Sequence, residues 1–203
     1  MDRIRRPTWN PRGIGTSWLR ILPIWRIRWP GMAERELVVA PAGGEGEMEA
    51  VRQLCRDYRR LLRERWPDVP AFLDRYYNAA TFEDLLRRLP ELHRPPDGAI
   101  FVARVGGKVV GCAMTHRVGP GDCEIKRVFV GDAARGLGAG AALFRAAMAQ
   151  ARRDGYSRMV LDTTTRLTEA IGLYRKLGFH EIAPFYDPPA DLAEHLMFFG
   201  RDL

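Results

Sequence analysis

The stretch "VFVGDAARGLGAGAALF", residues 128–144, holds four glycines within ten residues, at positions 131, 136, 138 and 140. An apolar run typical of a strand precedes them, and an alanine-rich run typical of a helix follows. Glycine allows positive φ and lets a ligand approach the backbone closely. The first amides of a helix have no partner within it, and the helix dipole is positive there. With Arg135 as a charged donor, the stretch predicts a loop that binds phosphate oxygens rather than a plain flexible turn.

The segments around this loop predict a mixed sheet with flanking helices. Apolar residues at helical spacing and at alternating spacing define them, and a meander of three strands precedes the glycine loop. The helices after the loop act as crossovers between strands, which gives an α/β (α+β) fold class with a mixed sheet. We expect Pro90 to end the second helix. The expected helices are 46–66, 71–90, 140–155 and 167–178, and the expected strands are 35–42, 99–105, 108–118, 123–130, 157–163, 179–186 and 194–203.

The chain of 203 residues has a net charge of +7, but this charge is unevenly distributed. Residues 1–31 hold seven arginines and one aspartate, which leaves 25 basic and 24 acidic residues for 32–203. Because 32–203 is almost neutral, a nucleic-acid-binding face is not indicated and we expect no nucleic-acid partner. Its 46% hydrophobic residues suffice for one ordinary core, so we expect a single domain over 32–203.

Residues 1–31 form a basic extension rich in tryptophan and proline, and Met32 resembles a natural start. A basic, Trp-rich segment can lie on a membrane surface. The favoured interpretation is instead a disordered extension that adds no core contacts. Three cysteines without CxxC spacing, scattered histidines and no long apolar run predict reduced thiols, no metal site and a cytoplasmic location. The sequence leaves a homodimer open.

The glycine run also fits the dinucleotide pattern G-x-G-x-x-A from Gly136, with Asp162 at the end of the next strand. Three features oppose an oxidoreductase of that kind. The first glycine lies too far beyond its strand, a meander precedes the motif, and only 63 residues follow Gly140.

Three segments in order resemble the GNAT family of N-acetyltransferases. They are R-x-x-G-x-G at Arg135, Gly138 and Gly140, "EIKRVFV" at 124–130 and "AIGLYRKLGF" at 170–179. The resemblance covers about 35–203. It implies a strongly twisted mixed sheet whose two central strands splay apart around the pantetheine arm of acetyl-CoA. It also implies acetyl transfer to a primary amine of a small-molecule or peptide acceptor, by direct attack in a ternary complex.

The resemblance implies roles for particular residues. Backbone groups of Val128, Phe129 and Val130 pair with the pantetheine arm, and Tyr174 protonates the departing thiolate. Glu124 is the candidate general base. The family often has asparagine where this chain has Leu167, so Thr168 is the candidate replacement for its polar contact. The pyrophosphate is held by the amides of Arg135, Gly136, Leu137, Gly138, Ala139 and Gly140.

Several alternatives stay open. Tyr174 can also be a core aromatic residue, and Glu124 can be a cross-strand ion-pair partner. A covalent route through Cys123 lacks an activating base. A non-catalytic acyl-CoA-binding module is the main rival function. The acceptor is not identified, and the segments expected to contact it include Arg63, Tyr76, Tyr77, Tyr186 and the loop 186–191 with Asp187 and Asp191.

Overall fold

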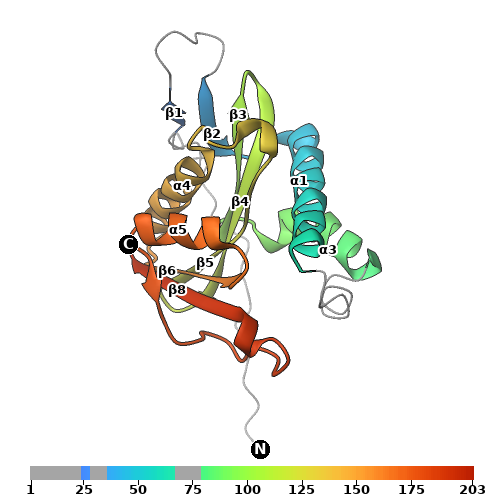
Figure 1. Cartoon of the computed structure of the whole chain (residues 1–203). Helices are drawn as coiled ribbons and strands as arrows, with labels where there is room; N and C mark the ends of the chain where they lie inside the picture. Colours follow the sequence, from blue (N-terminus) through green and yellow to red (C-terminus); the bar gives the residue numbers. More distant parts are fainter. Residues whose placement is uncertain (1–23, 28–35, 67–78) are drawn as a thin grey trace, which may run out of the picture.

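One eight-stranded sheet forms the centre of the computed structural model, which describes residues 24–27, 36–66 and 79–203 (Figure 1). The strand order is β1-β2-β3-β4-β5-β6-β8-β7. Neighbours are antiparallel except β5 and β6, which are parallel, so the predicted mixed sheet is confirmed. The strands are β1 Trp25–Ile27, β2 Leu37–Pro41, β3 Gly98–Val105, β4 Lys108–Gly119, β5 Asp122–Val130, β6 Arg158–Thr164, β7 His180–Glu181 and β8 Leu196–Asp202.

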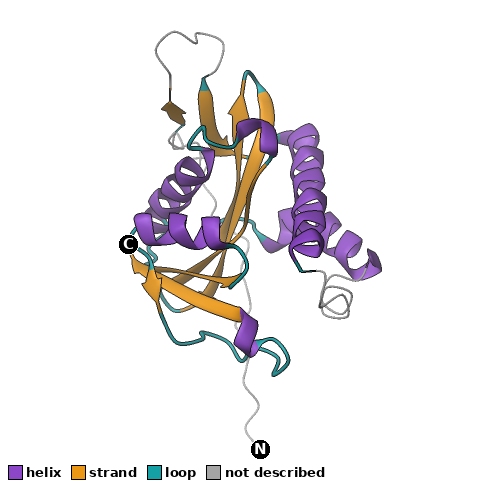
Figure 2. Ribbon diagram, in the orientation of Figure 1, coloured by secondary structure: helices purple, strands orange, loops and turns teal. Residues whose placement is uncertain are grey.

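Helices cover both faces of the sheet (Figure 2). Helices α1 (Gly44–Arg65) and α3 (Ala79–Leu92) lie on one face, and α4 (Ala139–Arg153) and α5 (Thr168–Lys176) lie on the other. Each helix buries one stripe of apolar residues, as amphipathic helices do. On α1 the buried stripe comprises Met48, Val51, Leu54, Cys55 and Leu62.

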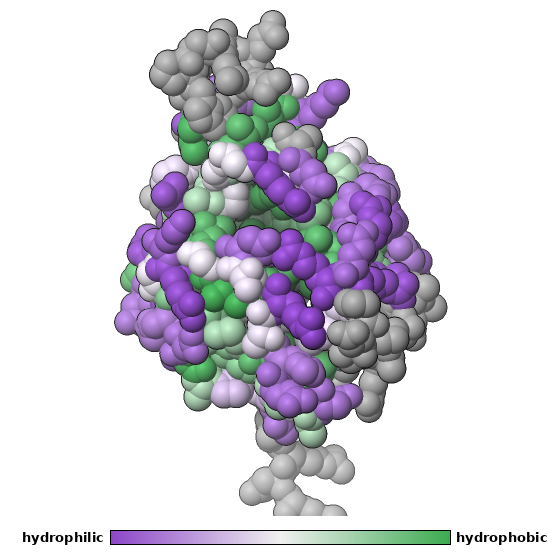
Figure 3. All heavy atoms as spheres, in the orientation of Figure 1, coloured by the Kyte–Doolittle hydropathy of each residue, from purple (hydrophilic) through white to green (hydrophobic). Residues whose placement is uncertain are grey.

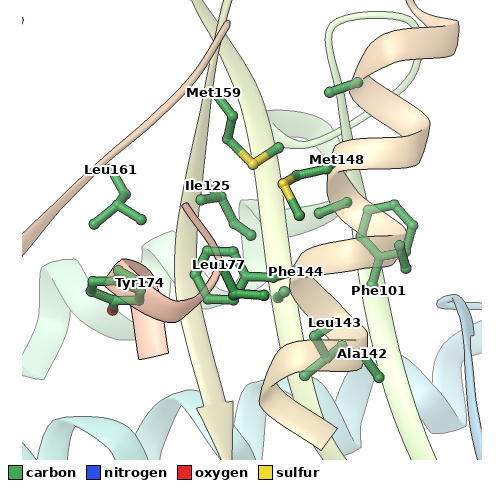
Figure 4. Packing of buried hydrophobic residues seen from close by; sticks show 14 of the residues in the cluster. Phe101, Ile125, Ala142, Leu143, Phe144, Met148, Met159, Leu161, Tyr174 and Leu177 are labelled. Atoms are coloured by element: carbon green, nitrogen blue, oxygen red, sulfur yellow. The ribbon is translucent and has the colours of Figure 1, made fainter. Parts of the chain in front are cut away.

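The larger core cluster lies between the sheet and the α4–α5 layer (Figure 4). The small alanines of α4 let Phe144 approach the ring of Tyr174, with ring centroids 5.4 Å apart. The rings of Phe179 and Phe199 complete this aromatic group. Tyr174 is therefore anchored in the core by its ring, which fixes the position of its hydroxyl.

The second helix does not end at Pro90, as the sequence predicted, but continues to Leu92. Proline lacks the N–H that would bond to the carbonyl four residues earlier, which is that of Leu86. Arg52 of α1 donates its Nε–H to this same carbonyl, at 3.3 Å. The side chain of a neighbouring helix thus replaces the missing backbone donor.

The strand predicted over 179–186 is also wrong in extent, since β7 contains only His180 and Glu181. One further backbone bond joins the amide of Ile182 to the carbonyl of Phe198, at 2.9 Å. Pro184 has no N–H for a sheet ladder, so pairing stops before it. The residues beyond it are free to form a loop beside the site.

The structure differs from the expectation for the N-terminal extension at β1. Trp25–Ile27 pairs antiparallel with β2 in the register Trp25↔Val39 to Ile27↔Leu37. Ile27 is partly buried and packs against the larger core cluster. This short strand therefore belongs to the sheet, while 1–23 and 28–35 lie outside the described residues.

Cys55, Cys112 and Cys123 are all free thiols and all buried. In the described ranges, no helix combines the length and the apolar character that crossing a membrane requires.

Candidate active site

The parallel strands β5 and β6 separate soon after they meet. Their register pairs Asp122–Glu124 with Arg158–Val160 and then stops, although both strands continue. Two cavities occupy the opening. The first, of about 520 Å³, lies over the glycine loop between α1, β5, α4 and α5. The second, of about 380 Å³, lies between α1, β5, β6 and the segment before β8. The splayed strands that the family resemblance implies are therefore present.

The glycine loop forms the floor of the first cavity. Gly136 has φ +79°, and Gly138, the N-cap of α4, has φ +71°, both in the left-handed region that favours glycine. A Cβ built on either glycine would meet no atom within 4 Å, so the space above the backbone is open. No side chain caps the helix, which leaves its first amides available to a ligand. These features suit phosphate oxygens.

Two other members of the loop have different surroundings. Arg135 lines the cavity and forms an ion pair with Asp132 at 2.6 Å. A Cβ on Gly140 would lie 3.2 Å from Cδ2 of Leu173, so this glycine allows α4 to pack closely on α5. Val128, Phe129, Val130, Gly138 and Ala139 all line the first cavity, whereas Leu137 is not among its lining residues.

An ion pair that sequence reasoning missed spans the first cavity. Arg65, the last residue of α1, donates two hydrogen bonds to Glu169 of α5, at 2.8 and 2.9 Å. Both residues line the cavity, and the bonds from Arg65 lower the pKa of Glu169 to about 2. No local pattern could have revealed this pair, because 104 residues separate its members. Hydrophilic side chains of this kind surround an apolar hollow on this face of the molecule (Figure 3).

Tyr174 of α5 lines both cavities and marks the place where they meet. Its side chain is 8% exposed, and burial raises its pKa to about 12, despite a hydrogen bond with Thr163. The phenol is therefore protonated at neutral pH and can donate a proton. Leu167 also lines both cavities, whereas the hydroxyl of Thr168 donates to Glu169 at 3.4 Å on the exposed side of the helix. Thr168 is thus not brought to the cavity.

A bulge interrupts β5 between the two cavities. Lys126 pairs with Met114 and Phe129 with Cys112, so Arg127 and Val128 together face one residue of β4. Arg127 has φ +49°, which is uncommon for a residue other than glycine. Val128 has no partner in the β4 register, and it lines both cavities.

The second cavity combines apolar walls with a few charged groups. Lys126, Arg127 and Asp162 line it, and Tyr186 donates a hydrogen bond from its hydroxyl to Asp162 Oδ2 at 3.2 Å. Burial is the main cause that raises the pKa of Asp162, and the nearby Glu124 adds to it. The apolar walls include Leu62, Trp66, Leu161, Leu192 and Leu196.

Of the residues expected at the acceptor, Tyr186 lines this cavity, together with Pro189 of the loop 186–191. Arg63, Asp187 and Asp191 are not among its lining residues. Tyr76 and Tyr77 lie outside the described residues.

Glu124 is 2% exposed and lines neither cavity. Its Oε1 accepts a hydrogen bond from Lys126 at 2.6 Å, and its Oε2 lies 3.0 Å from Nε2 of its cross-strand partner His116. Burial alone would raise the pKa of Glu124, but His116 and Lys126 outweigh it and lower the pKa. The cross-strand ion pair that the sequence left open is therefore present.

Burial raises the pKa of the Cys123 thiol to about 12, so this thiol is a poor nucleophile. Among the residues that the structure describes, no group of three or more His, Cys, Asp or Glu side chains could hold a metal ion.

Comparison with known proteins agrees with this geometry. A model of the acetyltransferase (GNAT) family matches residues 51–179, more than half of the chain. An uncharacterized N-acetyltransferase of Schizosaccharomyces pombe is 35% identical over 138 residues, which are 66% of this chain and 80% of that protein. The uncharacterized N-acetyltransferase YjgM of Escherichia coli is 32% identical over 61% of this chain and 74% of its own length.

Solved structures share the fold. A GNAT acetyltransferase of Staphylococcus aureus superposes with a TM-score of 0.62 at 16% identity, over 82% of this chain and 98% of that one. The PaiA N-acetyltransferase of Thermoplasma acidophilum, in complex with coenzyme A, superposes with a TM-score of 0.60 at 11% identity, over 82% and 99%. The splayed strands, the glycine loop and the family match agree, and the chain belongs to the GNAT family as an acetyl-CoA-dependent acetyltransferase.

Proposed function

We propose that the protein transfers the acetyl group of acetyl-CoA to the primary amine of a small acceptor, by direct attack in a ternary complex. The observation that supports this most strongly is the meeting of two cavities at Tyr174. One cavity offers helix amides and glycines to a pyrophosphate, and the other offers charged and apolar groups to an acceptor. A donor and an acceptor bound in them would meet near the Tyr174 hydroxyl.

The donor lies in the first cavity. The α4 amides around Gly138 bind its pyrophosphate. Backbone groups of Val128 and Val130 form hydrogen bonds with its pantetheine amides along the open edge of β5, as an added strand would. This arrangement directs the thioester toward the bulge and Tyr174. A backbone amide of the bulge is then near enough to stabilise the oxyanion that forms on the acetyl carbonyl.

The acceptor amine must lose a proton before it can attack, because an ammonium group has no free electron pair. The sequence predicted Glu124 for this step, but its two oxygens are engaged by Lys126 and His116 and its pKa is lowered. Asp162 lines the acceptor cavity and has a raised pKa, so its carboxylate is the stronger base. We therefore assign the proton transfer to Asp162 and a supporting role to Glu124.

The amine nitrogen attacks the acetyl carbon, the carbon–sulfur bond breaks, and coenzyme A leaves as a thiolate. Asp162 takes one proton of the ammonium group before the attack, and the nitrogen loses a second proton to water as the tetrahedral intermediate collapses to the amide. Tyr174 gives its hydroxyl proton to the thiolate. Exchange with water returns both side chains to their starting states.

A transfer assay tests this proposal. Radiolabelled acetyl-CoA is incubated with the protein and a panel of primary amines, and labelled amide is separated from free acetate. We expect amide product with at least one small amine, in excess over the protein. Stoichiometric acetyl-CoA binding without amide product would instead support a non-catalytic acyl-CoA-binding module.

A further inference from the structure

We propose that the acceptor is a small amine that also carries an acidic group, such as a free amino acid, with the acidic group bound by Arg127 and the amine held at Asp162. This inference rests on the proposed acetyl transfer and names the class of its acceptor. Charged groups of both signs line the second cavity, and an amine without an acidic group would leave the positive charge there without a counter-ion.

Arg127 is a partly buried cation without a side-chain partner. In the part of the chain that the structure describes, its guanidinium makes no hydrogen bond or ion pair, and only its backbone carbonyl accepts a bond, from Cys112. Its neighbour Lys126 lies in the same cavity but is neutralised by Glu124 at 2.6 Å. A partly desolvated guanidinium without a counter-ion is costly, and a bound carboxylate would remove most of that cost.

No carboxylate is among the described groups whose pKa the charge of Arg127 shifts. Its charge acts on the thiols of Cys55 and Cys112, which lie on α1 and β4, and on the imidazole of His93. Burial, with a smaller contribution from Arg127, lowers the pKa of His93 to about 4, so this ring is neutral at physiological pH. The hydrogen bond with Cys112, with a smaller contribution from Arg127, lowers the pKa of the Cys55 thiol, whereas Cys55 and burial raise the pKa of Cys112. None of the three groups is a carboxylate, and the cavity that Arg127 lines is open to one from a ligand.

The backbone holds this cation in place. Arg127 lies at the bulge of β5 with φ +49°, a conformation that a residue other than glycine seldom adopts without a reason. The bulge sits between the donor cavity and the acceptor cavity, since its second residue, Val128, lines both. An acceptor bound to Arg127 is thus held beside the thioester.

Asp162 provides the opposite charge on β6, across the same cavity. Its Oδ2 accepts one hydrogen bond from Tyr186 at 3.2 Å, which leaves lone pairs for an amine. Together Arg127 and Asp162 match a molecule with one acidic and one basic end. The apolar walls and a volume of about 380 Å³ suit a small body between those ends, with hydrophobic side chains favoured.

A peptide N-terminus is a different class of acceptor, because the carboxyl group of its first residue is tied up in a peptide bond and carries no charge that could pair with Arg127. The same holds for simple monoamines and polyamines. Comparing acceptors that differ only in the acidic group therefore separates these classes.

The experiment measures kcat/KM for three sets of acceptors with acetyl-CoA. The first set is L-amino acids, including leucine and phenylalanine. The second is the corresponding amines without the carboxylate, 3-methylbutylamine and phenethylamine, and the third is the amino acid amides. We expect kcat/KM for at least one amino acid to exceed that for its decarboxylated counterpart by about 10-fold or more, because a desolvated charge pair contributes at least that much to binding.

Variants of Arg127 test the residue itself. Arg127→Met should lower kcat/KM for the amino acid by about 10-fold or more, mainly through KM, and should lower kcat/KM for the decarboxylated amine by a clearly smaller factor. Arg127→Lys keeps the charge but not the planar fork, so it should restore part of the loss. The melting temperature of each variant controls for folding.

Equal turnover of amino acids and decarboxylated amines, or a preference for amides, would overturn the zwitterionic acceptor while leaving N-acetyl transfer intact. An Arg127→Met defect of the same size on both sets would make Arg127 a structural residue and overturn its assignment. If no amine in any set is acetylated, the proposed function itself fails, and this inference fails with it.

Discussion

Tyr174 lies where the two cavities meet, with its ring held by aromatic neighbours and its hydroxyl protonated at neutral pH. Tyr174→Phe keeps the ring and removes only the hydroxyl. We expect kcat to fall about 10–100-fold with little change in acetyl-CoA affinity, because a thiolate can leave unprotonated but more slowly. Single-turnover rates, which report the chemical step, give the measurement.

Tyr156 provides a matched control for this variant. It is also buried, and its hydroxyl donates to the carbonyl of Asp97 at 3.1 Å. Neither Tyr156 nor Asp97 is among the lining residues of the two cavities. Tyr156→Phe should lower stability slightly and leave kcat unchanged. If Tyr174→Phe behaves as Tyr156→Phe does, Tyr174 is a packing residue and the acid is elsewhere.

Asp162 and Glu124 differ in their expected pH dependence. Asp162→Asn removes the proposed base, so the rate should fall about 10²–10⁴-fold at neutral pH. The defect should shrink as pH rises toward the pKa of the acceptor amine, because more of the amine is then already deprotonated. Rates measured from pH 6 to 10 on one acceptor test this.

Glu124→Gln should act indirectly. Glu124 helps to raise the pKa of Asp162, so its neutral replacement should lower that pKa. The wild-type rate falls as pH drops through the pKa of Asp162, where the base becomes protonated. In Glu124→Gln this fall should therefore move to lower pH. A defect in Glu124→Gln that shrinks with rising pH, and none in Asp162→Asn, would return the base role to Glu124.

At the scale of the elements, the glycine loop and the N-terminus of α4 could be predicted from sequence, because their conformation depends on neighbouring residues. Positive φ at Gly136 and Gly138 is a local property, and so is an uncapped helix start. The contact between Arg65 and Glu169 could not be predicted, since it forms only when α1 and α5 meet across the cleft. The continuation of α3 through Pro90 was missed for the same reason, because Arg52 comes from another helix.

Gly138→Glu tests the loop as a phosphate site. The new carboxylate would lie in the open space above the loop, where it repels a pyrophosphate. We expect at least a ~10-fold loss of coenzyme A affinity by calorimetry. Gly138→Ala is the control, because it introduces the same strain at positive φ without charge or bulk. Equal affinities in the two variants would show that strain alone acts and that no pyrophosphate lies there.

Arg52 and Pro90 form a second test at this scale. Arg52→Met leaves the Leu86 carbonyl without its donor, and we expect a loss of about 1–2 kcal/mol in the free energy of unfolding. Pro90→Ala restores a backbone N–H for that carbonyl, so the same Arg52→Met change should cost less in its background. The ion pairs of Arg52 with Glu45 and Glu49 are lost in both backgrounds and cancel. Urea denaturation of the wild type, the two single variants and the double variant measures the coupling between Arg52 and Pro90. Strictly additive losses of unfolding free energy would contradict that coupling.

At the scale of the whole molecule, the sequence pattern predicted the mixed sheet and the family resemblance implied the splayed strands, but neither indicated which side chains line the space between those strands. The acceptor cavity combines residues of α1, β5, β6 and the segment before β8. Residues such as Leu62, Arg127 and Asp162 have no pattern in common along the chain. Only the fold reveals that they face one cavity, so the acceptor class could not be inferred earlier.

The N-terminal segment provides the last prediction. The sequence suggested that residues 1–31 add no core contacts, so that a chain starting at Met32 would be as stable as the full chain, but β1 pairs with β2 and Ile27 packs on the core. Removing residues 1–31 should lower the free energy of unfolding by about 1 kcal/mol, a fall of about 2–4 °C for a domain of this size. Activity at 25 °C should be unchanged, because β1 and β2 lie at one edge of the sheet, separated from β5 and β6 by β3 and β4, and contribute no lining residue to either cavity. The exposed edge of β2 should also raise the tendency to aggregate, which light scattering measures.

A chain that begins at Ile24 is the matched control, since it removes residues 1–23 and keeps β1. It should melt within about 1 °C of the full chain, because it keeps β1 and its free energy of unfolding should therefore hardly change. If the chain from Met32 also matches the full chain, the pairing of β1 adds no stability and the original expectation is correct. If the chain from Ile24 already melts lower, residues before β1 supply the stability that we assign to the strand. The strand is the source only if the loss appears between the two truncations, because they differ by residues 24–31, of which 24–27 are described and contain β1.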